Sequence, residues 1–98
     1  MTDNTQTVEE STSKLEELIE FPATLTFKFV GNNNDAASTV IAAFFKDDLG
    51  LEAIITAGRT SRTGKYITFN VTTTVADKDL LLKIYKQGAE LPHIMHVL

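Results

Sequence analysis

The order of hydrophobic and polar residues predicts four strands in this chain. Residues 24–30, TLTFKFV, alternate strictly, with Leu25, Phe27 and Phe29 on one face, as in a strand with one buried side. Residues 65–75, KYITFNVTTTV, are rich in β-branched and aromatic side chains and predict another strand. The two remaining strands are expected over residues 51–57 and 93–98.

Two helices are expected between these strands. Asn34 or Asp35 suits the N-cap of a helix over residues 35–48, and Gly50 follows it where a left-handed residue is favoured. Asp77 suits the cap of a second helix, over residues 77–89. The expected apolar faces are Ala37, Val40, Ile41 and Phe44 in the first helix and Leu80, Leu81, Ile84 and Gly88 in the second.

The resulting order, β-α-β-β-α-β, is that of the ferredoxin-like α+β sandwich, in which two helices cover one face of a four-stranded antiparallel sheet. Right-handed crossovers place the first and third strands at the centre and make the second and fourth strands the edges. The expected core then includes Phe27, Phe29, Ile67 and Phe69. The expected open face carries Thr26, Lys28, Tyr66, Thr68, Asn70 and Thr72.

The N-terminal region is predicted to differ from the rest. Residues 1–12 are polar and acidic, so we expect a mobile tail, because they cannot bury enough surface to offset their ordering entropy. A short helix is expected from Ser13 up to Pro22, with an apolar stripe. That stripe consists of Leu15, Leu18 and Ile19. We therefore expect a tail over residues 1–12 and a single domain over residues 13–98.

Charge and composition narrow the functional classes. The net charge of −4 is uneven, since residues 1–22 carry −5 and residues 23–98 carry +1. Nucleic-acid binding is disfavoured, because it usually requires a basic domain. The chain has no cysteine, and it shows no secretory signal or apolar run long enough to span a bilayer. These features predict a cytoplasmic protein without a membrane partner.

The stretch GRTSRTGKY, residues 58–66, offers a first candidate site. A phosphate-binding P-loop is excluded, because Gly58 and Gly64 have five residues between them rather than four, Tyr66 replaces the Ser or Thr, and a strand follows. The stretch instead predicts a long hairpin connection with Gly64 at positive φ. Its cations, together with two residues of the open face, are the candidate partner contacts: Arg59, Arg62, Lys65, Tyr66 and Lys28.

The sequence contains no catalytic signature. His93 and His96 lie three apart in a predicted strand and would point to opposite faces, so they are not expected to share a metal. No strained G-x-S-x-G elbow is present. RNA recognition on the open face is disfavoured, because Tyr66 alone provides an aromatic there. We expect no enzyme activity, no cofactor and no metal site.

Three segments resemble the small bacterial YbeD-like proteins, a family of unknown function. They are LEELIEFPATLTFKFVG, with Leu18, Phe21 and Pro22; SRTGKYITFNV, with Ser61, Gly64 and Tyr66; and the ending LPHIMHVL. The resemblance covers roughly residues 14–98. It implies a ferredoxin-like fold similar to ACT-type regulatory domains, which bind small ligands such as amino acids at subunit interfaces.

The leading hypothesis from the sequence is a non-catalytic regulatory or protein-interaction module. Its partner is either an unknown protein or a second copy, bound through the open sheet face or an edge strand. The alternative is an ACT-like domain that binds a small metabolite, and RNA binding is the least favoured hypothesis.

Overall fold

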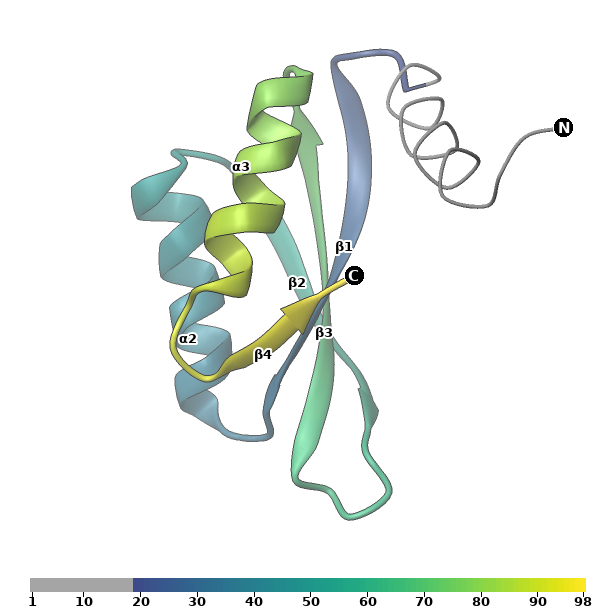
Figure 1. Cartoon of the computed structure of the whole chain (residues 1–98), viewed down its shortest axis with the longest axis vertical. Helices are drawn as coiled ribbons and strands as arrows, with labels where there is room; N and C mark the ends of the chain where they lie inside the picture. The colour runs from purple at the N-terminus through teal and green to yellow at the C-terminus, as the bar shows by residue number, and fades with distance from the viewer. Residues whose placement is uncertain (1–18) are drawn as a thin grey trace, which may run out of the picture.

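The computed structural model describes residues 19–98, which form a sheet with one layer of helices (Figure 1). The helices α2 and α3 lie on the same side of the sheet, and its other side carries no described helix. The elements in chain order are β1 (Ala23–Asn32), α2 (Asp35–Ala43), the π-helical turn η1 (Phe44–Asp48), β2 (Ala53–Thr60), β3 (Tyr66–Val75), α3 (Lys78–Ala89) and β4 (Ile94–Val97).

The strand order β2-β3-β1-β4 is antiparallel throughout and confirms the predicted ferredoxin-like topology. The two central strands, β1 and β3, pair over their full lengths, from Ala23 opposite Val75 to Asn32 opposite Tyr66. Their alternation was the cleanest in the sequence, because each has one face in the core and one face outside it.

The core lies between the sheet and the helices. It contains the predicted Phe27, Phe29 and Phe69, whereas Ile67, near the start of β3, is only partly buried and packs against the core. Ring edges pack against ring faces between Phe29 and Phe45, with centroids 5.7 Å apart. The remaining fully buried aliphatic and aromatic side chains are Ala37, Ile41, Phe44, Val71, Val75 and Ile84.

Both helices begin at the predicted caps. The Asn34 side chain accepts a hydrogen bond from the Ala37 amide at 3.0 Å, and the Asp77 carboxylate accepts one from the Leu80 amide at 2.8 Å. Gly50 has the expected positive φ, 64°. No helix among the described residues is long and apolar enough to cross a membrane.

Three predicted boundaries are wrong. The first helix is not α-helical up to residue 48, since its last five residues form η1, a wider turn that buries Phe45 beside Phe44. The second strand runs over Ala53–Thr60 rather than residues 51–57, so Gly58, Arg59 and Thr60 belong to β2 and not to the connection. His93 lies outside β4, in a turn closed by the Ile94 amide and the Leu91 carbonyl, 3.3 Å apart.

The predicted tail over residues 1–12 and most of the predicted N-terminal helix lie outside the described residues. Of the apolar stripe assigned to that helix, only Ile19 is described. Ile19 and Phe21 are partly buried and pack against the core, so the segment leading into β1 is part of the folded body.

Candidate functional site

The side of the sheet away from the helices is the candidate site, and we call it the open face. Its composition is set by the strand register, since every second residue of each strand points to it. One row across the sheet holds Ile54, Thr72 and Thr26, and the next holds Thr56, Asn70 and Lys28. The other residues of this face are Thr24, Val30, Asn32, Tyr66, Thr68, Thr74 and His96.

Threonines dominate one end of the open face and bond to each other across the central strands. The hydroxyls of Thr26 and Thr72 are 2.8 Å apart, and those of Thr24 and Thr74 are 3.1 Å apart. Directly opposed hydroxyl pairs of this kind stabilise a sheet by fractions of a kcal/mol each, typically about 0.2–1 kcal/mol. This part of the face is a structural hydroxyl ladder that also keeps the surface polar.

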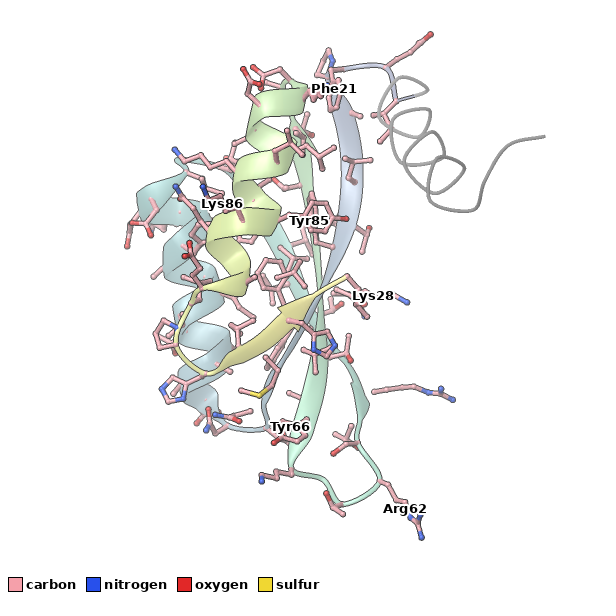
Figure 2. All side chains as sticks on the ribbon, viewed as in Figure 1. Phe21, Lys28, Arg62, Tyr66, Tyr85 and Lys86 are labelled. Atoms are coloured by element: carbon pink, nitrogen blue, oxygen red, sulfur yellow. The ribbon has the colours of Figure 1, made fainter. Side chains whose placement is uncertain are left out.

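The connection between β2 and β3 lies at the opposite end of the sheet and contains Arg62 and Lys65, with Arg62 at its tip (Figure 2), whereas Arg59 lies in β2 just before it. Gly64 has a φ of 76°, as predicted, and its amide donates to the Ser61 carbonyl at 2.9 Å. The Ser61 hydroxyl accepts from the Tyr66 amide at 3.0 Å, which closes the turn. Five residues, 61–65, therefore connect the strands.

The base of this turn is also bound to the end of β1. The Asn33 amide donates to the Lys65 carbonyl at 3.0 Å, and the Asn33 side chain donates to the Gly64 carbonyl at 2.9 Å. The asparagine run after β1 therefore fixes the position of the hairpin base as well as capping α2. These contacts define where the neighbouring cations project.

Arg59 occupies a bulge, where the pairing of β2 with β3 shifts between Ala57 and Thr60. Gly58 begins this bulge because the backbone of β3 is very close: a Cβ at Gly58 would lie 2.8 Å from the Thr68 carbonyl oxygen. The bulge and the turn expose Arg59, Arg62 and Lys65 to solvent at one end of the sheet.

Tyr66 joins this group, whereas Lys28 lies apart from it. The Lys65 ammonium is 5.4 Å from the centroid of the Tyr66 ring, within the range of a cation–π contact. Lys28 is opposite Asn70, two rows from the Asn32–Tyr66 row, and projects from the middle of the open face (Figure 2). A shallow hollow of about 140 Å³ links the group to the face and is lined by Val30, Arg59, Thr60, Ser61, Tyr66, Ile67 and Thr68.

Charge is segregated between the two sides of the described structure. None of the four strands contains an aspartate or glutamate, and neither does the turn over residues 61–65. The acidic residues of the described part lie before β1, in or beside the helices, and in the connection to β2: Glu20, Asp35, Asp47, Asp48, Glu52, Asp77, Asp79 and Glu90. The open face and hairpin are therefore positive, although the whole chain is acidic.

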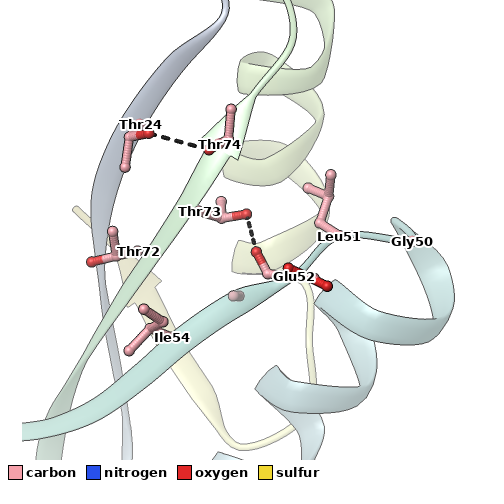
Figure 3. Close-up of a pocket in the computed structure, with 9 residues that line it drawn as sticks. Thr24, Gly50, Leu51, Glu52, Ile54, Thr72, Thr73 and Thr74 are labelled. Atoms are coloured by element: carbon pink, nitrogen blue, oxygen red, sulfur yellow. Dashed lines mark hydrogen bonds between the residues drawn. The ribbon is translucent and has the colours of Figure 1, made fainter.

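A larger hollow lies at the threonine end of the sheet and was missed in the sequence (Figure 3). Its volume is about 630 Å³, and its wall includes Glu52 and the exposed Ile54. The buried Thr73 hydroxyl donates to the Glu52 carbonyl at 2.7 Å and so fixes this wall. Other lining residues are Thr24, Gly50, Leu51, Ala53, Thr72 and Thr74. The hollow is the natural place to test the ACT-like ligand hypothesis, which stays a prediction.

The two histidines occupy different settings. His93 precedes β4 with a φ of 68°, and its carbonyl accepts from the Asn32 amide at 2.9 Å. His96 is in β4 opposite Val30 and faces the open side. Within residues 19–98, no three His, Asp or Glu side chains are grouped so as to hold a metal ion.

Comparison with known proteins gives the family. A "UPF0250 protein" of Shewanella piezotolerans is 33% identical over 86 residues, which cover 88% of this chain and 97% of that protein. A "UPF0250 protein" of Shewanella halifaxensis is 28% identical over the same shares of both chains. The solution structure of protein HP0495 from H. pylori shares the fold, with a TM-score of 0.66 and 16% identity over 82% of this chain and 85% of that one.

A family model described as "Protein of unknown function (DUF493)" matches residues 16–98, which include all of the residues that the structure describes. This match and the Shewanella relatives confirm the resemblance that the LEELIEFP, SRTGKY and LPHIMHVL segments indicated. The chain therefore belongs to the DUF493 family of small bacterial proteins of unknown function, the YbeD-like proteins.

Proposed function

We propose that this chain is a non-catalytic protein-interaction module that binds an acidic segment of a partner protein with its hairpin and open face. The observation that carries the proposal is the segregation of charge. Arg59, Arg62 and Lys65 have no acidic side chain in the strands or the turn around them, although the described residues 19–98 hold as many acidic as basic residues. A positive surface of this kind attracts carboxylates and accelerates encounter with an acidic partner.

The shape of the hairpin suits this role. It extends past the helices at one end of the molecule, with Arg62 at its tip (Figures 1 and 2). Hydrogen bonds from Asn33 fix its base, so less ordering entropy is lost when a partner binds there. Arginine also offers a planar pair of donors for carboxylates.

An extended partner segment lying along the open face would meet three kinds of group. Carboxylates reach the hairpin cations at one end, an apolar side chain reaches the hollow beside Tyr66, and a further carboxylate reaches Lys28 in the middle of the face. Beyond Lys28, the threonine ladder offers this segment polar side chains that carry no charge and therefore do not repel its carboxylates. We also propose a cytoplasmic location, because the sequence shows no secretory signal and no apolar run long enough to span a bilayer.

The test compares two variants with the same change in charge. The first replaces Arg59, Arg62 and Lys65 by glutamate, and the second replaces Lys46, Lys83 and Lys86, three exposed lysines in the helix layer. Proteins that co-purify with each tagged variant from the native cell are identified at about 0.05 M and 0.5 M salt, with and without nuclease.

We expect a partner that binds the parent chain and the helix-layer variant, is lost from the hairpin variant, and dissociates at high salt because its contacts are solvent-exposed. Binding that survives reversal of the hairpin charges contradicts the proposal. Nuclease-sensitive binding contradicts it as well, and would favour the RNA hypothesis instead.

A further inference from the structure

The edge of the sheet beside β4 is only partly occupied. β4 pairs with β1 from Phe29 onward, and the last backbone hydrogen bonds join Lys28 and Leu98 at 3.1 and 2.7 Å. β1 begins five residues before Lys28, at Ala23. Within residues 19–98, the segment Ala23–Phe27 therefore has β3 on one side and no strand on the other. We call this segment the free edge.

Two residues direct their backbone groups toward the free edge. Lys28 directs both its N–H and its C=O toward β4, and residues two apart in a strand direct these groups to the same side. The N–H and C=O groups of Thr24 and Thr26 therefore face outward, where no described strand lies opposite them. Exposed groups of this kind readily pair with an added strand.

Apolar side chains border the free edge on the helix side. Leu25 is half-buried there, and Tyr85 of α3 packs edge-on against Phe27 with ring centroids 5.3 Å apart. Tyr85 is 39% exposed and lies close to β1 (Figure 2), and Leu82, three residues earlier on the same flank of α3, is 45% exposed. A strand added here would bury all three side chains further.

We propose that the free edge pairs with the free edge of a second copy of this chain, forming a two-fold symmetric dimer with one continuous sheet. A pairing centred on Leu25 sets Thr24 opposite Thr26 of the second copy and Thr26 opposite its Thr24. These two pairs make four backbone hydrogen bonds. Leu25 then meets the Leu25 of the second copy, with Leu82 and Tyr85 from both chains around them.

The length and chemistry of the free edge favour a second copy over another peptide. In the two-fold register Ala23 lies opposite Phe27 of the second copy, so the pairing fills the gap up to Lys28, which is already bound to Leu98 just after β4. The next residue outward is Pro22, which has no N–H to leave unpaired. Residues 21–27, FPATLTF, carry no charge, so no like charges meet along the pairing.

This inference deepens the interaction role proposed above, but it can fail separately, because the purified 98-residue chain alone tests it and the hairpin cations take no part. The oligomeric state is measured by sedimentation velocity over a range of concentrations up to about 1 mM, so that a dimer with a dissociation constant as weak as about 1 mM is still detected. We expect a reversible monomer–dimer equilibrium.

Thr26→Pro is the informative variant, because it removes a donor from the free edge and leaves the bonds to β3 in place. It deletes two of the four hydrogen bonds in the dimer, so the dissociation constant should rise about 25-fold or more. Ala57→Pro is the matched control on the other edge strand. Ala57 is exposed, and by the same alternation its N–H points away from β3.

A second pair of variants tests the dimer without a proline, in case Thr26→Pro does not fold. Leu82→Glu places like charges near the two-fold axis and should also weaken the dimer at least tenfold, whereas Ile54→Glu, at another exposed apolar site, on the open face, should not. A chain that stays monomeric throughout overturns the inference. So does a dimer that persists in Leu82→Glu, or one that is lost in Ala57→Pro or Ile54→Glu with the fold intact.

Discussion

Replacing Gly88 by alanine should destabilise this protein, although alanine is the better helix former. Gly88 lies in α3 where the helix crosses β1 and β4. A Cβ at this position would lie 2.9 and 3.0 Å from two atoms of the Phe29 ring and 3.4 Å from a methyl of Val97. The first two distances are shorter than atoms in contact normally allow.

The magnitude follows from two opposing terms. Alanine gains about 1 kcal/mol over glycine inside a helix. Overpacking a core costs about 1–3 kcal/mol, and the upper part of that range applies here because Phe29 is fully buried and locked against the ring of Phe45. The net loss should be about 1–2 kcal/mol. For a domain of this size it lowers Tm by roughly 4–15 °C.

Thermal unfolding followed by circular dichroism measures the effect. Lys83→Ala and Lys83→Gly, at an exposed site in the same helix, give the ordinary preference for alanine without a steric term. Phe29→Leu should relieve the overlap, so the double variant with Gly88→Ala should be more stable than the sum of the single changes by about 1 kcal/mol. A Gly88→Ala protein that melts above the parent would refute the reasoning.

Three further predictions concern single contacts, each read from urea unfolding. Removing a helix cap with Asn34→Ala or Asp77→Ala should cost about 1 kcal/mol, because an amide of the first turn loses its acceptor; equal stability of Asp77→Ala and the parent would show that the cap contributes nothing. Thr73→Val should cost about 1–3 kcal/mol, since the hydroxyl that bonds the Glu52 carbonyl at 2.7 Å is 4% exposed. Thr73→Ser should retain most of the stability, and a loss as large as that of valine would point to packing instead. His93→Val should cost about 1–2 kcal/mol because a β-branched residue resists a φ of 68°, and His93→Gly should be far less harmful; the reverse order would exclude backbone strain as the cause.

The topology could be predicted because the decisive signals are local. The strict alternation of residues 24–30 and the β-rich run of residues 65–75 fix which faces are buried, and Asn34 and Asp77 fix where the helices start. With four strands and two helices in this order, few arrangements remain. The antiparallel pairing of β1 with β3 then followed from the crossovers.

The errors come from properties that do not show in local periodicity. Phe45 breaks the 3.6-residue pattern because η1 widens the helix by one residue, and this allows two adjacent phenylalanines to be buried. The second strand was expected to end at residue 57, whereas Gly58 continues β2, where β3 passes too close for a side chain. In both places contacts with residues distant in the sequence determine the conformation of the backbone.

The candidate site was also predictable only in part. The cations of GRTSRTGKY are visible in the sequence, but the lack of acidic residues in the strands and the turn around them becomes visible only when the eight acidic residues of the described part are assigned to the other segments. The free edge arises because β4 has four residues where β1 has ten, a difference that matters only once the register is known. The topology alone predicts the second and fourth strands as the edges and does not reveal the exposed part of β1.

Photo-crosslinking in the native cell tests the proposed interaction most directly. A photoreactive amino acid replaces Thr63, which is exposed next to Arg62 in the hairpin turn, or Gln87, which is exposed on α3. The account predicts a crosslinked partner peptide rich in aspartate and glutamate at Thr63, no such product at Gln87, and loss of the product when Arg59, Arg62 and Lys65 are changed to glutamate. A partner captured at Gln87 alone, or a Thr63 product that survives the charge reversal, would contradict it.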